Sequence, residues 1–118
     1  MWNINKEVFS QYARILDRKE NYCYQYHGEY MFLFLKERER YFNEILRLKG
    51  YVLLNDVYDS IGLSRIPDYH NVGWLYNEED PIGDNFIDFG IYDLTKLVNG
   101  MCDENIIIDF NVDGIIRY

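Results

Sequence analysis

The chain has 118 residues, of which 48% are hydrophobic and 18% aromatic, and its formal net charge is −8. This length and a hydrophobic content well above that of disordered chains predict a single folded domain over residues 1–118. The longest uncharged apolar run has six residues, 30–35, against about 20 for a membrane-spanning helix, and charges throughout the first twenty residues exclude a signal peptide. We therefore expect a soluble, cytoplasmic protein that makes no contact with membranes.

The negative charge belongs to the second half of the chain. Residues 1–50 carry nine Lys or Arg against seven Asp or Glu, a balance of +2, whereas residues 51–118 carry three against thirteen, a balance of −10. A field of that sign repels nucleic acid and attracts basic surfaces. It also keeps a tyrosine-rich domain in solution, and composition does not separate these two interpretations.

Helical spacing dominates the first half. Apolar residues recur at three- and four-residue steps between positions 4 and 16, which predicts a first helix from about 5 to 20 with Asn3 or Asn5 as its N-cap. Residues 22–32 change period and indicate either a short hairpin or the kinked start of a helix. From 33 to 49 the helical period returns, and Gly50 ends this second helix. Its predicted inner face comprises Phe34, Leu35, Tyr41, Phe42, Ile45, Leu46 and Leu48, with Arg40 and Glu44 paired on the other side.

Strand signals dominate the second half, after a short third helix. In that helix Leu54, Val57, Tyr58 and Ile61 share one face, with Asn55 as the cap and Gly62 at the end. A strand over residues 72–76 follows, flanked by loops that contain both prolines. Residues 86–92 and 105–110 are β-prone, and 93–101 favour a helical turn. Residues 111–114 predict a tight turn that forms a β-hairpin with a last strand over 115–118.

The segregation of helices and strands predicts the fold class. Alternating βαβ units would mix the two kinds of element along the chain, whereas here they separate. We expect an α+β fold, in which a helical N-terminal half packs on a small antiparallel β-sheet from the C-terminal half.

No motif in the sequence predicts a catalytic centre. P-loop, GxGxxG and GxSxG patterns are absent. The two histidines, His27 and His70, lack the neighbours of a general base or a metal site. Cys23 and Cys102 stand alone and are expected to be reduced. The basic residues of the second helix alternate with Glu37, Glu39 and Glu44, which favours a solvated helix face over a nucleic-acid stripe.

Acidic residues near the C-terminus suggest two metal sites, neither of them complete. Residues 109–114 (DFNVDG) match the start of an EF-hand loop, but isoleucines flank them and the acid required at position twelve would fall beyond Tyr118. Asp84, Asp88, Asp109 and Asp113 would suit a metal-dependent phosphoesterase only if they converged on Mg²⁺. We therefore expect no catalytic residues, no metal and no cofactor.

Several short segments resemble an uncharacterised domain family of Firmicutes bacteria and their phages. The segments that carry the resemblance are residues 50–58 (GYVLLNDVY), 61–63 (IGL), 73–74 (GW), 87–89 (IDF) and 109–112 (DFNV). The resemblance covers roughly residues 35–118. It carries no assigned activity, and it implies a small accessory protein of a phage or mobile element.

Charge and context together favour a binding protein rather than an enzyme. Small acidic proteins of such origin act by occupying a host protein, and an acidic surface can compete with nucleic acid for a positively charged channel. We expect an inhibitor of a host protein in the host-cell cytoplasm, such as a CRISPR or other defence nuclease, with no direct binding of nucleic acid. Its expected contact residues are Glu78, Glu79, Asp80 and Asp84. A self-assembling structural phage protein and, after it, a metal-dependent phosphoesterase are the alternatives.

Overall fold

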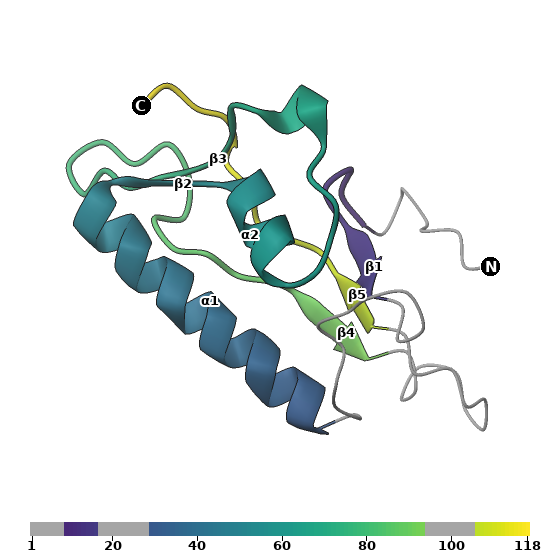
Figure 1. Ribbon diagram of the computed structural model, residues 1–118. Helices are drawn as coiled ribbons and strands as arrows, with labels where there is room; N and C mark the ends of the chain where they lie inside the picture. Colours follow the sequence, from purple (N-terminus) through teal and green to yellow (C-terminus); the bar gives the residue numbers. More distant parts are fainter. Residues whose placement is uncertain (1–8, 17–28, 94–105) are drawn as a thin grey trace.

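The computed structural model describes residues 9–16, 29–93 and 106–118 (Figure 1). Within these ranges the chain forms two antiparallel three-stranded sheets, two α-helices and a 3-10 turn. The first sheet has the order β1 (Arg14–Leu16), β5 (Ile106–Ile108), β4 (Ile91–Asp93). The second has the order β2 (Tyr51–Leu53), β3 (Val72–Leu75), β6 (Gly114–Ile115). The fold is therefore α+β, as the sequence predicts.

Helix α1 (Glu29–Lys49) runs along one side of the molecule (Figure 1). Met31, Leu35, Phe42 and Leu46 are buried and lie on one stripe of the helix. The helix ends where Gly50 adopts φ +93° and its N–H donates to the Leu46 carbonyl over 2.8 Å. The predicted helix and its end are confirmed, and its start lies four residues earlier.

The buried face of α1 is narrower than predicted. Tyr41 is 50% exposed and Leu48 88% exposed, although helical spacing placed both with the core residues. Both sheets and α2 approach α1 from one side only, so side chains at the edge of the predicted face remain in water (Figure 1).

Helix α2 (Leu54–Ser60) confirms the third predicted helix but corrects the role of Asn55. The N-cap is Leu53, with no side-chain hydrogen bond, and Asn55 lies inside the helix and is buried. The Asn55 amide pairs with both backbone groups of Ile66, donating to its carbonyl over 2.9 Å and accepting from its N–H over 2.8 Å. Asn55 thus fastens the loop before the 3-10 turn (Pro67–Tyr69) instead of capping a helix.

The predicted first helix is wrong over residues 9–16: residues 9–13 form no helix, and residues 14–16 form β1. This strand pairs with β5, Arg14 opposite Ile108 and Leu16 opposite Ile106. All three isoleucines of β5 are buried between β1 and β4. Pairing with this β-branched central strand outweighs the helical spacing, because tertiary contacts override weak local propensity. The helical N-terminal half is therefore only partly confirmed, and the predictions for residues 22–28 and 94–101 lie outside the described residues.

The predicted C-terminal hairpin is also wrong, because β5 and β6 belong to different sheets. After β5 the chain turns towards β3, where the Asp113 N–H donates to the Gly73 carbonyl over 3.1 Å. The Asp113 carboxylate in turn accepts from the Leu75 N–H over 2.9 Å. Residues 111–114 are thus a crossover between sheets. The predicted strand over residues 72–76 is confirmed as β3. Of the β-prone segment 86–92, only residues 91 and 92 form a strand, at the start of β4.

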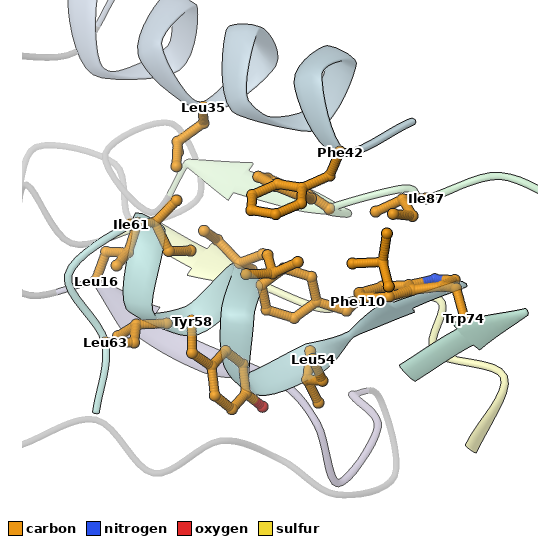
Figure 2. Packing of buried hydrophobic residues seen from close by; sticks show 14 of the residues in the cluster. Leu16, Leu35, Phe42, Leu54, Tyr58, Ile61, Leu63, Trp74, Ile87 and Phe110 are labelled. Carbon is orange, nitrogen blue, oxygen red and sulfur yellow. The ribbon is translucent and has the colours of Figure 1, made fainter. Parts of the chain in front are cut away.

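Aromatic rings join the two sheets, α2 and the segment before β4 in one core (Figure 2). The Phe110 ring makes edge contacts with Tyr58, Trp74 and Phe89, at centroid distances of 5.6, 6.2 and 5.2 Å. The Trp74 indole N–H, fully buried, donates to the Asn111 side-chain oxygen over 2.9 Å. All of these residues belong to the short segments by which the sequence resembles the uncharacterised family. Those segments therefore build the hydrophobic core.

Candidate protein-binding site

The four predicted contact residues lie together in one exposed loop. This acidic loop, residues 77–85, follows β3 and carries Glu78, Glu79, Asp80 and Asp84, all exposed. Its base is closed by Asn85, whose side chain accepts from the Asn77 N–H and donates to the Asn77 carbonyl, both over 3.0 Å. Asn85 has φ +60°, a left-handed conformation that asparagine tolerates better than most residues. The loop is therefore closed by its own hydrogen bonds.

In residues 9–16, 29–93 and 106–118, the carboxylates of the acidic loop have hydrogen-bond partners but no cationic partner. The Asn77 side-chain oxygen accepts from the N–H groups of Glu79 and Asp80, over 3.2 and 3.1 Å. Glu78 accepts from the Tyr76 hydroxyl over 3.0 Å, and Asp84 accepts from the Asn111 amide over 2.9 Å. In the described part of the chain none of the four forms an ion pair. All four side chains are exposed to solvent.

Two apolar side chains accompany these charges. Ile82, in the acidic loop, is 56% exposed. Phe86, the first residue after the loop, is 49% exposed. Protein interfaces commonly combine apolar or aromatic anchors with a polar rim. The loop and Phe86 together provide both components.

Beside the acidic loop, an open groove of about 480 Å³ separates α1 from residues 85–88. We call it the α1 groove; its lining from the helix is Lys36, Glu39, Arg40, Asn43 and Arg47.

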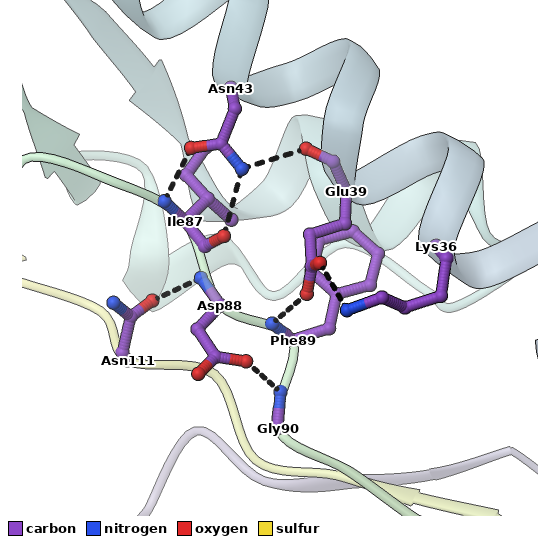
Figure 3. Close-up of polar contacts among 8 residues, drawn as sticks. All are labelled: Lys36, Glu39, Asn43, Ile87, Asp88, Phe89, Gly90 and Asn111. Carbon is purple, nitrogen blue, oxygen red and sulfur yellow. Dashed lines mark hydrogen bonds and ion pairs between the residues drawn. The ribbon is translucent and has the colours of Figure 1, made fainter.

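Two polar side chains of α1 hold the opposite wall of the groove in place (Figure 3). The Asn43 side chain accepts from the Ile87 N–H over 2.7 Å and donates to the Ile87 carbonyl over 2.9 Å. One carboxylate oxygen of Glu39 accepts from the Phe89 N–H over 2.8 Å, while the other pairs with Lys36 over 2.7 Å. The groove therefore has walls fixed to each other by side-chain bonds.

Three cations of α1 lie on the side of the helix that lines the groove. Lys36, Arg40 and Arg47 lie on the groove side of α1, because steps of four and seven residues return to the same helix side. Arg40 is held by Glu37 over 2.8 Å and Glu44 over 3.7 Å. The groove therefore holds these three cations together with carboxylates, since Glu39 and Asp88 line it as well.

Arg47 lies at the end of the α1 groove next to the acidic loop, because it lines the groove together with Asn85, the last residue of the loop. The hydrogen bond to Glu78 raises the pKa of Tyr76, and the charge of Arg47 opposes that rise. Among the described residues Arg47 has no ion-pair partner.

The aspartates considered for a metal are each engaged with their own partners. Asp88 accepts from the Gly90 N–H over 2.9 Å, and Asp109 accepts from the Ser10 N–H over 3.1 Å. Asp113 lies near Asp84, and burial together with that neighbouring charge raises its pKa. Within residues 9–16, 29–93 and 106–118 no group of three His, Cys, Asp or Glu residues could hold a metal ion. His70 is exposed, and His27 and both cysteines lie outside the described residues.

A known protein family matches almost the whole chain. The model of a family described as a family of unknown function (DUF6353) matches residues 3–118. No curated protein and no solved structure matches the chain. In the part of the chain that is described, no helix is long and apolar enough to cross a membrane.

Proposed function

The chain belongs to the DUF6353 family, and we propose that it is a non-enzymatic protein that binds a basic surface of a host protein through its acidic loop. The observation that supports this proposal most directly is the acidic loop, which its own hydrogen bonds close. The loop exposes four carboxylates that form no ion pair among the described residues. A small accessory protein of a Firmicutes phage or mobile element, acting in the host cytoplasm, is the context that we propose.

The charge of the loop suits a target that normally binds nucleic acid. CRISPR effectors and other defence nucleases hold nucleic acid in positively charged channels, and closely spaced carboxylates can occupy such a channel in place of phosphates. Opposite charge raises the association rate, and the exposed Ile82 and Phe86 side chains add apolar contact area. The proposal is therefore an inhibitor that acts as a nucleic-acid mimic.

The test is affinity capture from host lysate followed by competition. The variant Glu79→Lys with Asp80→Lys reverses two charges whose side chains hold no part of the loop, since only their backbone N–H groups bond to Asn77. We expect a nucleic-acid-binding protein that the wild type retains, that the variant does not retain, and that free DNA or RNA displaces. Raising the salt from about 50 to about 500 mM should release it, because the screening length falls.

The control is Asp68→Lys, which reverses an exposed charge in the 3-10 turn outside the loop. Capture that survives reversal of the loop, or a retained protein that nucleic acid does not displace, would contradict the proposal.

A further inference from the structure

The side chain of Asn111 joins the acidic loop to the buried core. Its oxygen accepts from the Trp74 indole N–H over 2.9 Å and from the Asp88 N–H over 2.7 Å, the second of which Figure 3 draws. Its NH2 group donates to the Asp84 carboxylate over 2.9 Å and to the Phe86 carbonyl over 3.0 Å. A carboxamide has two hydrogens to donate and two lone pairs to accept with, so this one is fully used.

The four partners fix the orientation of this amide. An indole or peptide N–H can only donate, whereas a carboxylate or carbonyl oxygen can only accept. The oxygen, which we call the acceptor half, therefore faces the buried Trp74 of β3 and the groove wall at Asp88. The NH2 group, the donor half, faces Asp84 and Phe86, two residues of the proposed contact surface.

The donor half holds the residues on both sides of Asn85. Asn85 closes the acidic loop through its two bonds to Asn77, and it does so at φ +60°. Residue 84 is tied to Asn111 through its side chain, and residue 86 through its carbonyl. A side chain other than glycine keeps a left-handed conformation where its surroundings hold it there. Asn111 supplies part of that hold, and so it fixes the point at which the loop is closed.

We propose that Asn111 is the positioning residue of the acidic loop, and that its donor half holds Asp84 and Phe86 in place before a partner binds. Asn111 acts through these two residues and not through contact with the partner. A surface that is ordered beforehand loses less conformational entropy on association, so it binds more tightly. This consequence rests on the proposed function, whereas the order of the loop is measured on the purified chain alone.

The variant Asn111→Asp separates the two halves of the amide. A carboxylate still accepts hydrogen bonds, so those from Trp74 and Asp88 remain. It has no hydrogen to donate, so both bonds of the donor half are lost, and a second negative charge lies beside Asp84. We therefore expect the core to stay folded and the acidic loop to loosen.

Hydrogen exchange followed by NMR reads both halves in one sample. The loop reports through the N–H groups of Asn77, Glu79 and Asp80, which bond within it. In Asn111→Asp we expect these to exchange about tenfold faster than in the wild type, the factor that one charge-assisted hydrogen bond provides. The Asp88 N–H and the Trp74 indole N–H should keep their wild-type rates. Unchanged exchange in the loop, or an equal acceleration at Trp74, would refute a positioning role.

Two further variants separate position from charge. Asp84→Asn alone keeps a side-chain oxygen that accepts from Asn111, so the loop should exchange at the wild-type rate. Asp84→Asn combined with Asn111→Asp reverses donor and acceptor, because the new amide at position 84 donates to the new carboxylate at position 111. The combined variant should recover most of the protection that Asn111→Asp alone loses. If it recovers none, the bond between the two positions does not order the loop.

The binding consequence is measured with the host protein that the wild type retains in the capture experiment. Asn111→Asp makes the chain more negative, so charge alone predicts equal or tighter binding to a basic surface. Positioning predicts binding about tenfold weaker. The control is Asn71→Asp, which adds the same charge at a half-buried position outside the loop and should not weaken binding.

The two measurements fail separately. If the wild type retains no host protein, the proposed function is wrong, and the exchange rates still decide the role of Asn111. If Asn111→Asp loosens the loop but binds the retained protein as tightly as the wild type does, the proposed function stands and the positioning role in binding is overturned.

Discussion

At the residue scale, asparagine side chains replace strand pairing in this domain. Asn43, Asn55 and Asn85 each use one amide to bond both the N–H and the carbonyl of a single residue, which lies 44, 11 and 8 positions away respectively. The carboxamide of asparagine carries the same donor and acceptor as a peptide group, so it satisfies irregular backbone that no strand covers. Two of these asparagines shape the candidate site directly, since Asn43 holds a wall of the α1 groove and Asn85 closes the acidic loop.

The contribution of such a residue is measurable at Asn43. Asn43→Ala removes bonds to Ile87 and to the Glu39 carbonyl and leaves the part-buried backbone of Ile87 without a partner. We expect the free energy of unfolding to fall by about 2–3 kcal/mol, the cost of several lost bonds with unsatisfied groups left behind. Urea denaturation followed by circular dichroism measures it. Asn71→Ala, at a half-buried position, is the control and should cost under about 0.5 kcal/mol; equal losses would contradict this role.

At the element scale, local periodicity predicts some segments and fails for others. Helices α1 and α2 and strand β3 follow from spacing and glycine positions, because their signals lie within each segment. Strands β1 and β6 do not, because each is defined by a partner distant in sequence, β5 and β3. The Asp113-Gly114 pair looks like a hairpin turn, yet bonds from Asp113 to β3 direct the chain to the other sheet.

The close approach of β2 to β3 depends on a glycine. A Cβ added at Gly73 would lie 2.1 Å from the Val52 carbonyl oxygen and 2.9 Å from the Leu53 Cα, both of them backbone atoms that cannot rotate away. We therefore expect Gly73→Ala to destabilise the domain by about 3 kcal/mol, at the upper end of overpacking costs.

Gly114→Ala provides the matched control. Gly114 lies in β6 opposite Gly73 and has φ +110°, but its Cβ would meet nothing within 4 Å. Its cost is conformational, about 1–2 kcal/mol for an L-residue at positive φ. Thermal unfolding of both variants makes the comparison, and a Gly73→Ala variant no less stable than Gly114→Ala would refute the steric account.

At the scale of the whole molecule, the sequence predicts half of the candidate site. The acidic loop follows from composition, because four acids within seven residues between two strand signals indicate an exposed charged loop. The α1 groove requires the tertiary structure. Its walls come from residues about forty positions apart, joined by Asn43 and Ile87, and its cations alternate with glutamates in the sequence.

The half-buried carboxylate of Asp113 makes the stability of the domain depend on pH. Burial raises the pKa of Asp113, and the nearby charge of Asp84 raises it further, against the opposing hydrogen bond from Leu75. Since the folded pKa lies above the unfolded one, the stability linked to this group is present at low pH and is lost as pH rises through the folded pKa.

The variant Asp113→Asn isolates this effect, because an asparagine oxygen can still accept from the Leu75 N–H while the charge is gone. We expect the variant to be more stable than the wild type at pH 7, with a difference that shrinks as the pH falls through the folded pKa of Asp113. Urea unfolding across that pH range measures the difference. Asp68→Asn, at an exposed position, is the control for the loss of one carboxylate. A difference at Asp113 that grows on acidification would mean that its charge stabilises the crossover between the sheets.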